Sequence, residues 1–172
     1  MGIKGLKHMS KAVETIQLAF YNSKYKQSLF TYELDEKQKH FTTLPEKAIE
    51  MFCINTTSYP VVILEKDIPV GFFILQDGEE AKDYTKRDHT MLIRSVSVNP
   101  QYQGKGFAQK AMQMIPSFVR QYYPKIEELF LLVNVKNKRA EHVYSKTGYE
   151  DRGIRCMGRV GPQKMLHYTL KN

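Results

Sequence analysis

Residues 101–108 read Gln101-Tyr102-Gln103-Gly104-Lys105-Gly106-Phe107-Ala108. They separate a β-rich segment that ends at Val98 from a stretch with helical periodicity that begins at Phe107. Where a strand, a glycine loop and a helix follow in this order, the unpaired N–H groups of the first helical turn point toward an anion, and glycine lets the backbone approach it closely. We therefore predict a phosphate-binding turn here. A flexible loop that is rich in glycine by chance is the alternative that two glycines alone leave open.

Two other phosphate-binding patterns compete to explain this turn. A dinucleotide-binding turn of the G-x-G-x-x-G type would need glycine or alanine at position 109, where Gln109 stands. A P-loop would need a G-x-x-x-x-G-K-[ST] string, and the sequence contains none. Neither pattern fits the chain.

The residues before the turn predict three strands. Segments 61–65 and 70–75 are rich in β-branched and aromatic residues and are joined by a hairpin turn at 66–69. An acidic, turn-rich stretch over 77–88 leads to a third strand over 91–98. The apolar alternation of this strand slips near Arg94-Ser95, as a β-bulge would cause, although misassigned burial would cause it too.

The residues after the turn predict alternating helices and strands. These are a helix over 107–122, a strand over 129–135, a helix over 137–146, and two strands with a turn at Gly161-Pro162. Proline inside the first helix, Pro116, is expected to kink it. Strands that alternate with single helices imply at least one parallel crossover in a mixed sheet.

The first 60 residues predict two helices, over 10–21 and over 44–52, the second with Pro45 in its first turn. The stretch 22–43 has no clear pattern. With 172 residues and no Pro/Gly/Ser-rich linker, the chain is expected to form one domain over 1–172.

The net charge of +8 is concentrated near the end of the chain, where residues 101–172 hold thirteen basic residues and five acidic ones. This excess suggests an anionic partner, and a solvated basic surface is the alternative. The sequence has no recognised nucleic-acid-binding motif, and its longest apolar run, 129–133, is far shorter than the roughly 18 residues of a membrane span. We therefore expect neither a nucleic acid nor a membrane as partner.

The cysteines and histidines indicate whether disulfides or a metal site are expected. Cys53 and Cys156 are too few for a disulfide framework, and the five histidines lack ligand spacing, so we expect no metal. No apolar segment follows Lys4 and Lys7 that could serve as a signal peptide. The expected location is the cytoplasm.

Two blocks of sequence resemble a known family, the GCN5-related N-acetyltransferases (GNAT). The turn, Gln101-x-x-Gly104-x-Gly106, resembles the family's Q/R-x-x-G-x-G/A signature. About thirty residues downstream the chain reads Asn137-x-x-Ala140-x-x-x-Tyr144-x-Lys146-x-Gly148-Tyr149, which resembles the family element N-x-x-A-x-x-x-Y-x-K-x-G-F/Y. The resemblance covers residues 60–170 well and the first 60 only by the order of elements.

The resemblance implies an α/β fold of mixed α+β type. It implies a mixed, mostly antiparallel central sheet of about seven strands with four or so helices, splayed between the fourth and fifth strands. With a first strand near 3–7, the splayed strands would be 91–98 and 129–135. A bulge at Arg94-Ser95 would open the gap between them.

The resemblance also implies acetyl-CoA as cosubstrate, with its pantetheine arm in that gap and its pyrophosphate at the turn. The implied contacts come from the strand end, the turn and the short helix: Val96, Ser97, Val98, Gln103, Gly104, Lys105, Gly106, Phe107, Ala108, Asn137 and Tyr144. Capping of the short helix is a second explanation for Asn137.

The chemistry that the resemblance implies is direct attack of an amine on the thioester. Tyr144 would be the general acid for the leaving thiolate, because a phenol is mostly protonated at neutral pH. The backbone N–H of Val98 would meet the developing oxyanion. Packing of an aromatic side chain in the core is the alternative role for Tyr144.

The acceptor is expected to be a primary amine of a small molecule. Residues 60–170 have some likeness to bacterial spermine and spermidine acetyltransferases, and Asp77, Glu79 and Glu80 could favour such a polyamine; a solvated loop is the alternative. A protein or peptide amine, a regulatory CoA-binding protein without turnover, and a homodimeric assembly also stay open.

Overall fold

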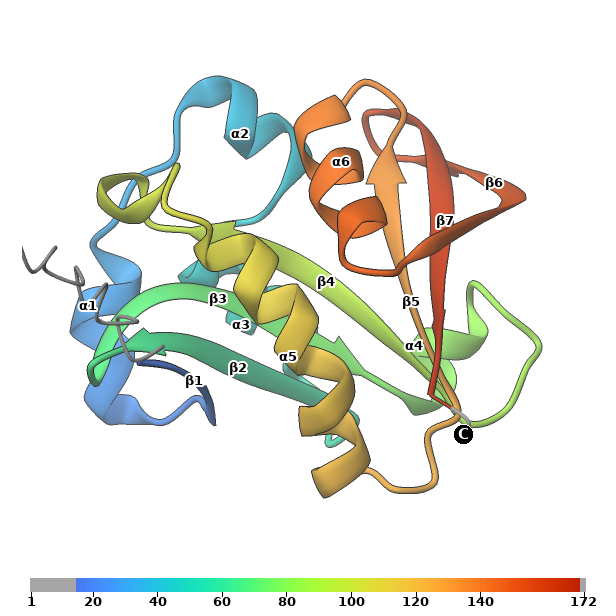
Figure 1. Cartoon of the computed structure of the whole chain (residues 1–172), viewed down its shortest axis with the longest axis horizontal. Helices are drawn as coiled ribbons and strands as arrows, with labels where there is room; N and C mark the ends of the chain where they lie inside the picture. Colours follow the sequence, from blue (N-terminus) through green and yellow to red (C-terminus); the bar gives the residue numbers. More distant parts are fainter. Residues whose placement is uncertain (1–14, 171–172) are drawn as a thin grey trace, which may run out of the picture.

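The computed structural model describes residues 15–170, which build one seven-stranded sheet in the order β1-β2-β3-β4-β5-β7-β6 (Figure 1). The strands are β1 Ile16–Phe20, β2 Ser58–Glu65, β3 Ile68–Gln76, β4 Thr90–Val98, β5 Glu128–Asn134, β6 Glu150–Gly158 and β7 Gly161–Thr169. Neighbouring strands are antiparallel except β4 and β5, which are parallel. The mixed, mostly antiparallel sheet is therefore confirmed.

Helices cover both faces of this sheet. They are α1 Lys26–Phe30, α2 Glu36–Phe41, α3 Pro45–Phe52, α4 Gly78–Lys82, α5 Phe107–Tyr122 and α6 Lys138–Lys146, with 3-10 turns η1 Ser23–Tyr25 and η2 Pro100–Tyr102. The predicted helices that become α3, α5 and α6 are confirmed. The additional helices α1, α2 and α4 have five or six residues each, too few to show a helical period in the sequence.

The helix predicted over 10–21 is wrong where the structure describes it. Residues Ile16–Phe20 form β1, which pairs antiparallel with β2. Over five residues the helical and strand periods select overlapping apolar positions, so the pairing of the backbone with β2 decides the conformation. Residues 10–14 of this predicted helix, and the strand predicted near 3–7, lie outside the described residues.

Two hairpin turns differ slightly from their predicted positions. Between β2 and β3 only Lys66 and Asp67 form the turn, both with positive φ of 48° and 67°. Between β6 and β7 the turn is Arg159-Val160 and not Gly161-Pro162, because Gly158 already pairs with Gly161. In both hairpins the ladder extends further toward the turn than residue preferences indicate.

Each face of the sheet has its own buried cluster. On one face, Met112, Ile115 and Val119 of α5 form a buried cluster with strand residues that include Met91 and Leu131, and α6 packs against this cluster. On the other face, α1 and α3 pack on β2 and β3. A small third cluster, formed by Ala81, Leu92, Phe130 and Met165, lies on this second face beside α4.

A β-bulge interrupts β4 at the predicted position. Phe72 pairs with Ser97 and Ile74 pairs with Arg94, so that Phe73 of β3 faces two residues, Ser95 and Val96. Ser95 has φ of 55°, in the left-handed region. The phase slip in the sequence therefore reflects a bulge and not misassigned burial.

The parallel pairing of β4 with β5 stops beside the bulge. Four pairs join the strands, from Thr90 with Glu128 to Ile93 with Leu131. Beyond Ile93, β5 continues to pair with β7 but not with β4, and the two strands diverge toward the end of the sheet near α2 (Figure 1). The predicted splay between the fourth and fifth strands lies here.

We predict that position 95 requires a residue that tolerates the left-handed conformation. Ser95→Gly should keep the free energy of unfolding within about 1 kcal/mol of the wild type, because glycine adopts positive φ freely. Ser95→Val should lower it by about 2 kcal/mol, because a β-branched residue is disfavoured there. Urea unfolding of the three proteins measures both effects, and equal stability of the two variants would contradict the role of the bulge.

Candidate functional site

The turn before α5 presents backbone donors to solvent. Gly104 and Gly106 have φ of 75° and 84°, and Gly106 is the N-cap of α5. The first intrahelical hydrogen bond runs from Lys110 N to Gly106 O, so the N–H groups of 107–109 have no acceptor within the helix. A Cβ at either glycine would meet nothing within 4 Å. Backbone conformation, and not crowding, therefore requires the two glycines.

Gln103 fastens this turn to its surroundings. Its Nε2 donates to the carbonyl of Val98 at 2.8 Å, and its Oε1 accepts from Gln38 Nε2 of α2 at 2.8 Å. The Lys105 ammonium lies 5.6 Å from the centroid of the Tyr102 ring. The Gln103 backbone N–H donates to Pro100 O at 3.3 Å, so both its side chain and its backbone N–H are engaged within the protein.

The end of β4 has backbone groups that no strand pairs with. Asn99 N donates to Val70 O of β3, so by alternation the N–H and C=O groups of Val96 and Val98 point away from β3. Their carbonyls accept instead from side chains, from Thr42 Oγ1 at 3.0 Å and from Gln103 Nε2 at 2.8 Å. The N–H groups of these two residues face the side from which β5 has diverged.

Ser97, between them, has its side chain on the opposite face of the sheet. Its hydroxyl lies 2.6 Å from the Tyr32 hydroxyl in a buried contact, and burial raises the pKa of Tyr32. This contact ties the segment after α1 to β4. Its side chain is therefore engaged in the protein interior.

Tyr144 projects from α6 onto the face that α5 covers. It packs against the main buried cluster, with its ring centroid 6.4 Å from that of Tyr149. Burial raises the pKa of Tyr144 to about 12. Its phenol is therefore protonated at neutral pH, and the same residue serves as a packing aromatic.

Asn137 caps the helix that carries Tyr144. Its Oδ1 accepts from Ala140 N at 3.3 Å, the hydrogen bond expected of an N-cap. The capping role that the sequence left open is thus observed. A contact with a cofactor would have to use the remaining atoms of the side chain or its backbone.

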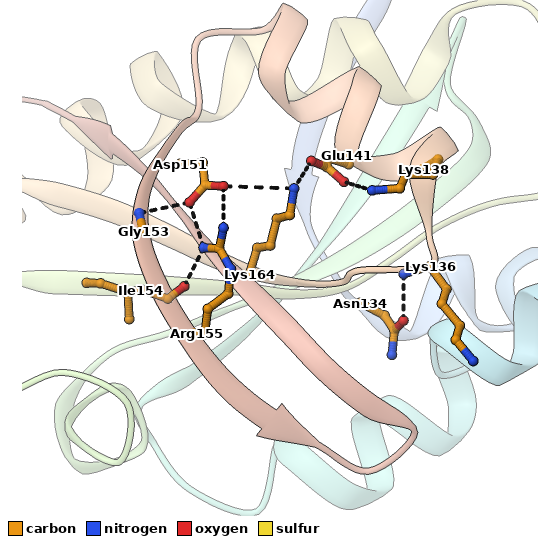
Figure 2. Close-up of polar contacts among 9 residues, drawn as sticks. All are labelled: Asn134, Lys136, Lys138, Glu141, Asp151, Gly153, Ile154, Arg155 and Lys164. Atoms are coloured by element: carbon orange, nitrogen blue, oxygen red, sulfur yellow. Dashed lines mark hydrogen bonds and ion pairs between the residues drawn. The ribbon is translucent and has the colours of Figure 1, made fainter.

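Ion pairs hold α6 on the β6–β7 hairpin (Figure 2). Lys164 of β7 bonds to Glu141 of α6 and lies 3.9 Å from Asp151 of β6. Arg155 binds both oxygens of Asp151, at 2.8 and 2.9 Å. Arg155, with smaller help from the Gly153 N–H and Lys164, lowers the pKa of Asp151 to about 2. This network holds α6, the helix that carries Tyr144, against the β6–β7 hairpin.

The predicted acceptor carboxylates are engaged elsewhere. Glu80 accepts from Thr57 Oγ1 at 2.6 Å, and Glu79 pairs with Lys82 at 3.5 Å. Burial raises the pKa of Asp77, and the Tyr59 hydroxyl beside it partly offsets that rise. The segment follows Gln76, which pairs with Leu92, six residues or about 20 Å along β4 from Val98. The structure does not bring these carboxylates to the turn.

Sequence reasoning missed the site residues that precede β2. Tyr32, Gln38 and Thr42 contact β4 or the turn through hydrogen bonds, yet they lie in the stretch 22–43 that had no clear pattern. Arg94 was considered only as the place of the phase slip. A charged residue inside a β-rich segment was the signal that could have marked it as a functional candidate. Long-range contacts of this kind leave no periodic trace in the sequence.

Within residues 15–170, no cluster of three or more His, Cys, Asp or Glu side chains is arranged to hold a metal ion. None of the helices formed by these residues combines the length and apolar character needed to cross a bilayer.

Comparison with known sequences identifies related proteins. The acetyltransferase (GNAT) family model matches residues 26–149. The chain is also 39% identical over 158 residues to YbbJ, an uncharacterized N-acetyltransferase of Bacillus subtilis (strain 168), a match that covers 91% of this chain and 99% of that protein.

Solved structures share the fold at low sequence identity. Spermidine N-acetyltransferase from Vibrio cholerae, in complex with CoA and spermine, superposes with a TM-score of 0.68 at 15% identity, covering 91% of this chain and 96% of that one. The aminoglycoside acetyltransferase AAC(6')-Ib, in complex with coenzyme A and kanamycin, gives a TM-score of 0.73 at 16% identity, covering 90% and 94%. These similarities establish the arrangement of elements around the site.

We predict that the Asp151 ion pairs stabilise the fold in a pH-dependent way. Because the folded-state pKa of Asp151 lies near 2, below its ordinary value of 3.8, the contribution is full above about pH 5 and disappears as the pH falls toward 2. After discounting for solvent screening, Asp151→Asn should cost about 1 kcal/mol at pH 7. Urea unfolding at pH 7 and pH 3 measures this, with exposed Asp83→Asn as control. An equal cost at both pH values would refute it.

Proposed function

The chain belongs to the acetyltransferase (GNAT) family, and we propose that it transfers an acetyl group from acetyl-CoA to a primary amine of a small molecule. One observation carries the proposal: a left-handed glycine turn opens α5 directly after a strand whose last residues have no β5 partner. Amides of a pantetheine arm and a pyrophosphate are the groups that such a strand edge and such a turn would bind.

The residues that would hold acetyl-CoA are those whose backbone N–H groups have no partner within residues 15–170. The N–H groups of 104–108 would bind the pyrophosphate, helped by the charge of Lys105, the N–H group of Val96 would bind the arm, and the N–H group of Val98 would face the thioester end of the arm. Solved relatives in complex with CoA or acetyl-CoA support this choice of ligand. Bound acetyl-CoA supplies the activated acetyl thioester. The Val98 N–H is then the donor proposed for the oxyanion.

Tyr144 is the residue proposed to assist departure of the thiolate. The amine nitrogen forms a bond to the acetyl carbon, the carbon–sulfur bond breaks, and the sulfur gains a proton. A thiol has an ordinary pKa of roughly 8.5, so complete transfer from a phenol of pKa about 12 is uphill. The Tyr144 hydroxyl therefore acts first by donating a hydrogen bond to sulfur, and the proton that the amine loses restores the balance.

Removal of the Tyr144 hydroxyl should affect turnover more than binding. We predict that Tyr144→Phe lowers kcat by roughly 10- to 100-fold and changes the Kd for CoA less than threefold, because the ring keeps its packing. Thiol release in an acceptor assay and calorimetry with CoA measure the two quantities. An unchanged kcat would remove Tyr144 from the mechanism.

The turn can be tested with a matched pair of glycines. Gly106 and Gly153 have nearly the same φ, 84° and 85°, and a Cβ at either would meet nothing within 4 Å. Gly106→Ala and Gly153→Ala should therefore each cost about 1 kcal/mol of stability. Only Gly106→Ala should weaken CoA binding, by about tenfold, because it displaces donors that contact an anion. Equal CoA affinities of the two variants would place the pyrophosphate elsewhere.

The acceptor class is tested by a screen for thiol release from acetyl-CoA. Polyamines, aminoglycosides, amino acids and peptide N-termini form the panel. The polyamine hypothesis depends on Asp77, Glu79 and Glu80, whose observed partners weaken it. CoA binding without turnover of any amine would favour the regulatory alternative, and turnover of peptides alone would favour protein acetylation.

A further inference from the structure

Arg94 is a largely buried cation that has no anionic partner. Its guanidinium donates from Nη1 to Gln76 Oε1 at 2.9 Å and stacks 3.5 Å from the centroid of the Phe52 ring. Its Nε is buried and has no hydrogen-bond partner. Among residues 15–170, the groups that contact Arg94 are uncharged: the Gln76 amide, the Phe52 ring and the Tyr84 hydroxyl. A buried charge without a counter-ion is costly, so such a group calls for an explanation.

Other arginines of this protein are neutralised within the fold. Arg87 and Arg152 both pair with Glu128, at 2.9 and 2.6 Å, and Arg155 pairs with Asp151 at 2.8 Å. These three are nevertheless on the outer part of the molecule, where water could solvate them. Arg94 lies deeper, burial lowers the pKa of its guanidinium, and it still lacks a carboxylate in this part of the chain.

The neighbours of Arg94 hold it in a fixed orientation. Gln76, whose Oε1 accepts from Arg94, is itself buried and donates from Nε2 to Ser58 Oγ at 2.8 Å and to Phe52 O at 3.3 Å. Phe52, from α3, covers one face of the guanidinium. Gln76 and the stacked ring hold this planar cation in place, the Tyr84 hydroxyl accepts from a further N–H, and the buried Nε–H is left for an anion to accept.

The position of Arg94 in the sheet selects among candidate anions. It immediately follows Ile93, the last residue of β4 that pairs with β5, and immediately precedes the bulge at Ser95. Its side chain leans toward Gln76, which pairs with Leu92, and therefore away from the turn. Val98 lies four residues further along β4, and the bulge keeps its distance from Arg94 to at most about 13 Å. Phosphates bound at the turn would thus lie beyond its reach.

Arg94 lies on the face of the sheet opposite the one that α5 and α6 cover. Tyr144 and α5 occupy the opposite face of the sheet, where Ile93 and Val98 point. Arg94 shares its face with Ile74, its partner across the ladder. Because Phe52 and Tyr84 lie against Arg94 on this face, an acceptor would reach it from the edge of β4 that β5 leaves after Ile93.

We propose that Arg94 binds a carboxylate of the acceptor, so that the acceptor is a small amine that also carries a carboxylate group. This inference rests on the proposed function and narrows its substrate class. A guanidinium in this place would repel a polyamine, and the carboxylates that would attract one lie at the end of the strand away from the turn and are already engaged. Arg94 is then a specificity residue, and Gln76 and Phe52 are its positioning residues.

The first test compares acceptors that differ only in the carboxylate. Thiol release from acetyl-CoA is measured with ω-amino acids of increasing length, whose amine and carboxylate are far enough apart to span from Val98 toward Arg94, and with the matching ω-amino amides. The wild type should prefer the acids by roughly tenfold or more in kcat/KM. Arg94→Gln should remove that preference by raising KM for the acids. Its Kd for CoA should stay unchanged, which would show that the fold is intact. Arg94→Lys, which keeps the charge but loses the planar fork, should keep part of the preference.

A second test does not require turnover. Calorimetry measures binding of the N-acetylated ω-amino acids and their amides to the CoA-bound protein. Binding of the acids that depends on Arg94, without turnover of any amine, would support the carboxylate site while refuting the proposed function. Turnover of polyamines with no preference for acids would do the reverse. Equal binding of sulfate and of the N-acetylated ω-amino acids, or an equal loss of acid and amide activity in Arg94→Gln, would overturn the inference.

Discussion

Ser95 adopts a left-handed backbone conformation inside β4, two residues after the last pair that joins β4 to β5. The bulge lets β4 keep its ladder with β3 while β5 continues with β7 alone. Backbone groups of Val96 and Val98 are thereby left without a strand partner in the centre of a sheet, where unpaired groups are normally costly. A bound ligand that supplies the missing partners would offset that cost, and this constraint links the fold to the proposed use of acetyl-CoA.

Much of this frame could be predicted from local sequence. The glycines at 104 and 106 mark the turn because they adopt positive φ, and the apolar stripe over 107–122 marks α5 because it repeats at the helical period. The bulge was visible as a slip in alternation near Ser95. In each case the conformation depends on contacts between residues close in sequence, so the sequence pattern alone predicts it.

The parts that could not be predicted depend on contacts between distant segments. Ile16–Phe20 is a strand because β2 pairs with it, not because of its own period. The Tyr32–Ser97 and Gln38–Gln103 contacts each join residues 65 positions apart. Arg94 becomes informative only when Phe52 and Gln76 are seen around it. The proposed acetyl-CoA site thus depends on local backbone preferences that the sequence reveals, whereas the surroundings of Arg94 depend on tertiary packing.

Amide hydrogen exchange with and without CoA tests most directly whether the open edge of β4 is the cofactor site. If it is, CoA should slow exchange at Val96 and Val98 and at the amides of 104–109 together, while the paired amides of Met91 and Ile93 change little. Slowed exchange confined to basic surface segments, with Val96 and Val98 unaffected, would contradict the link between the bulge and the ligand.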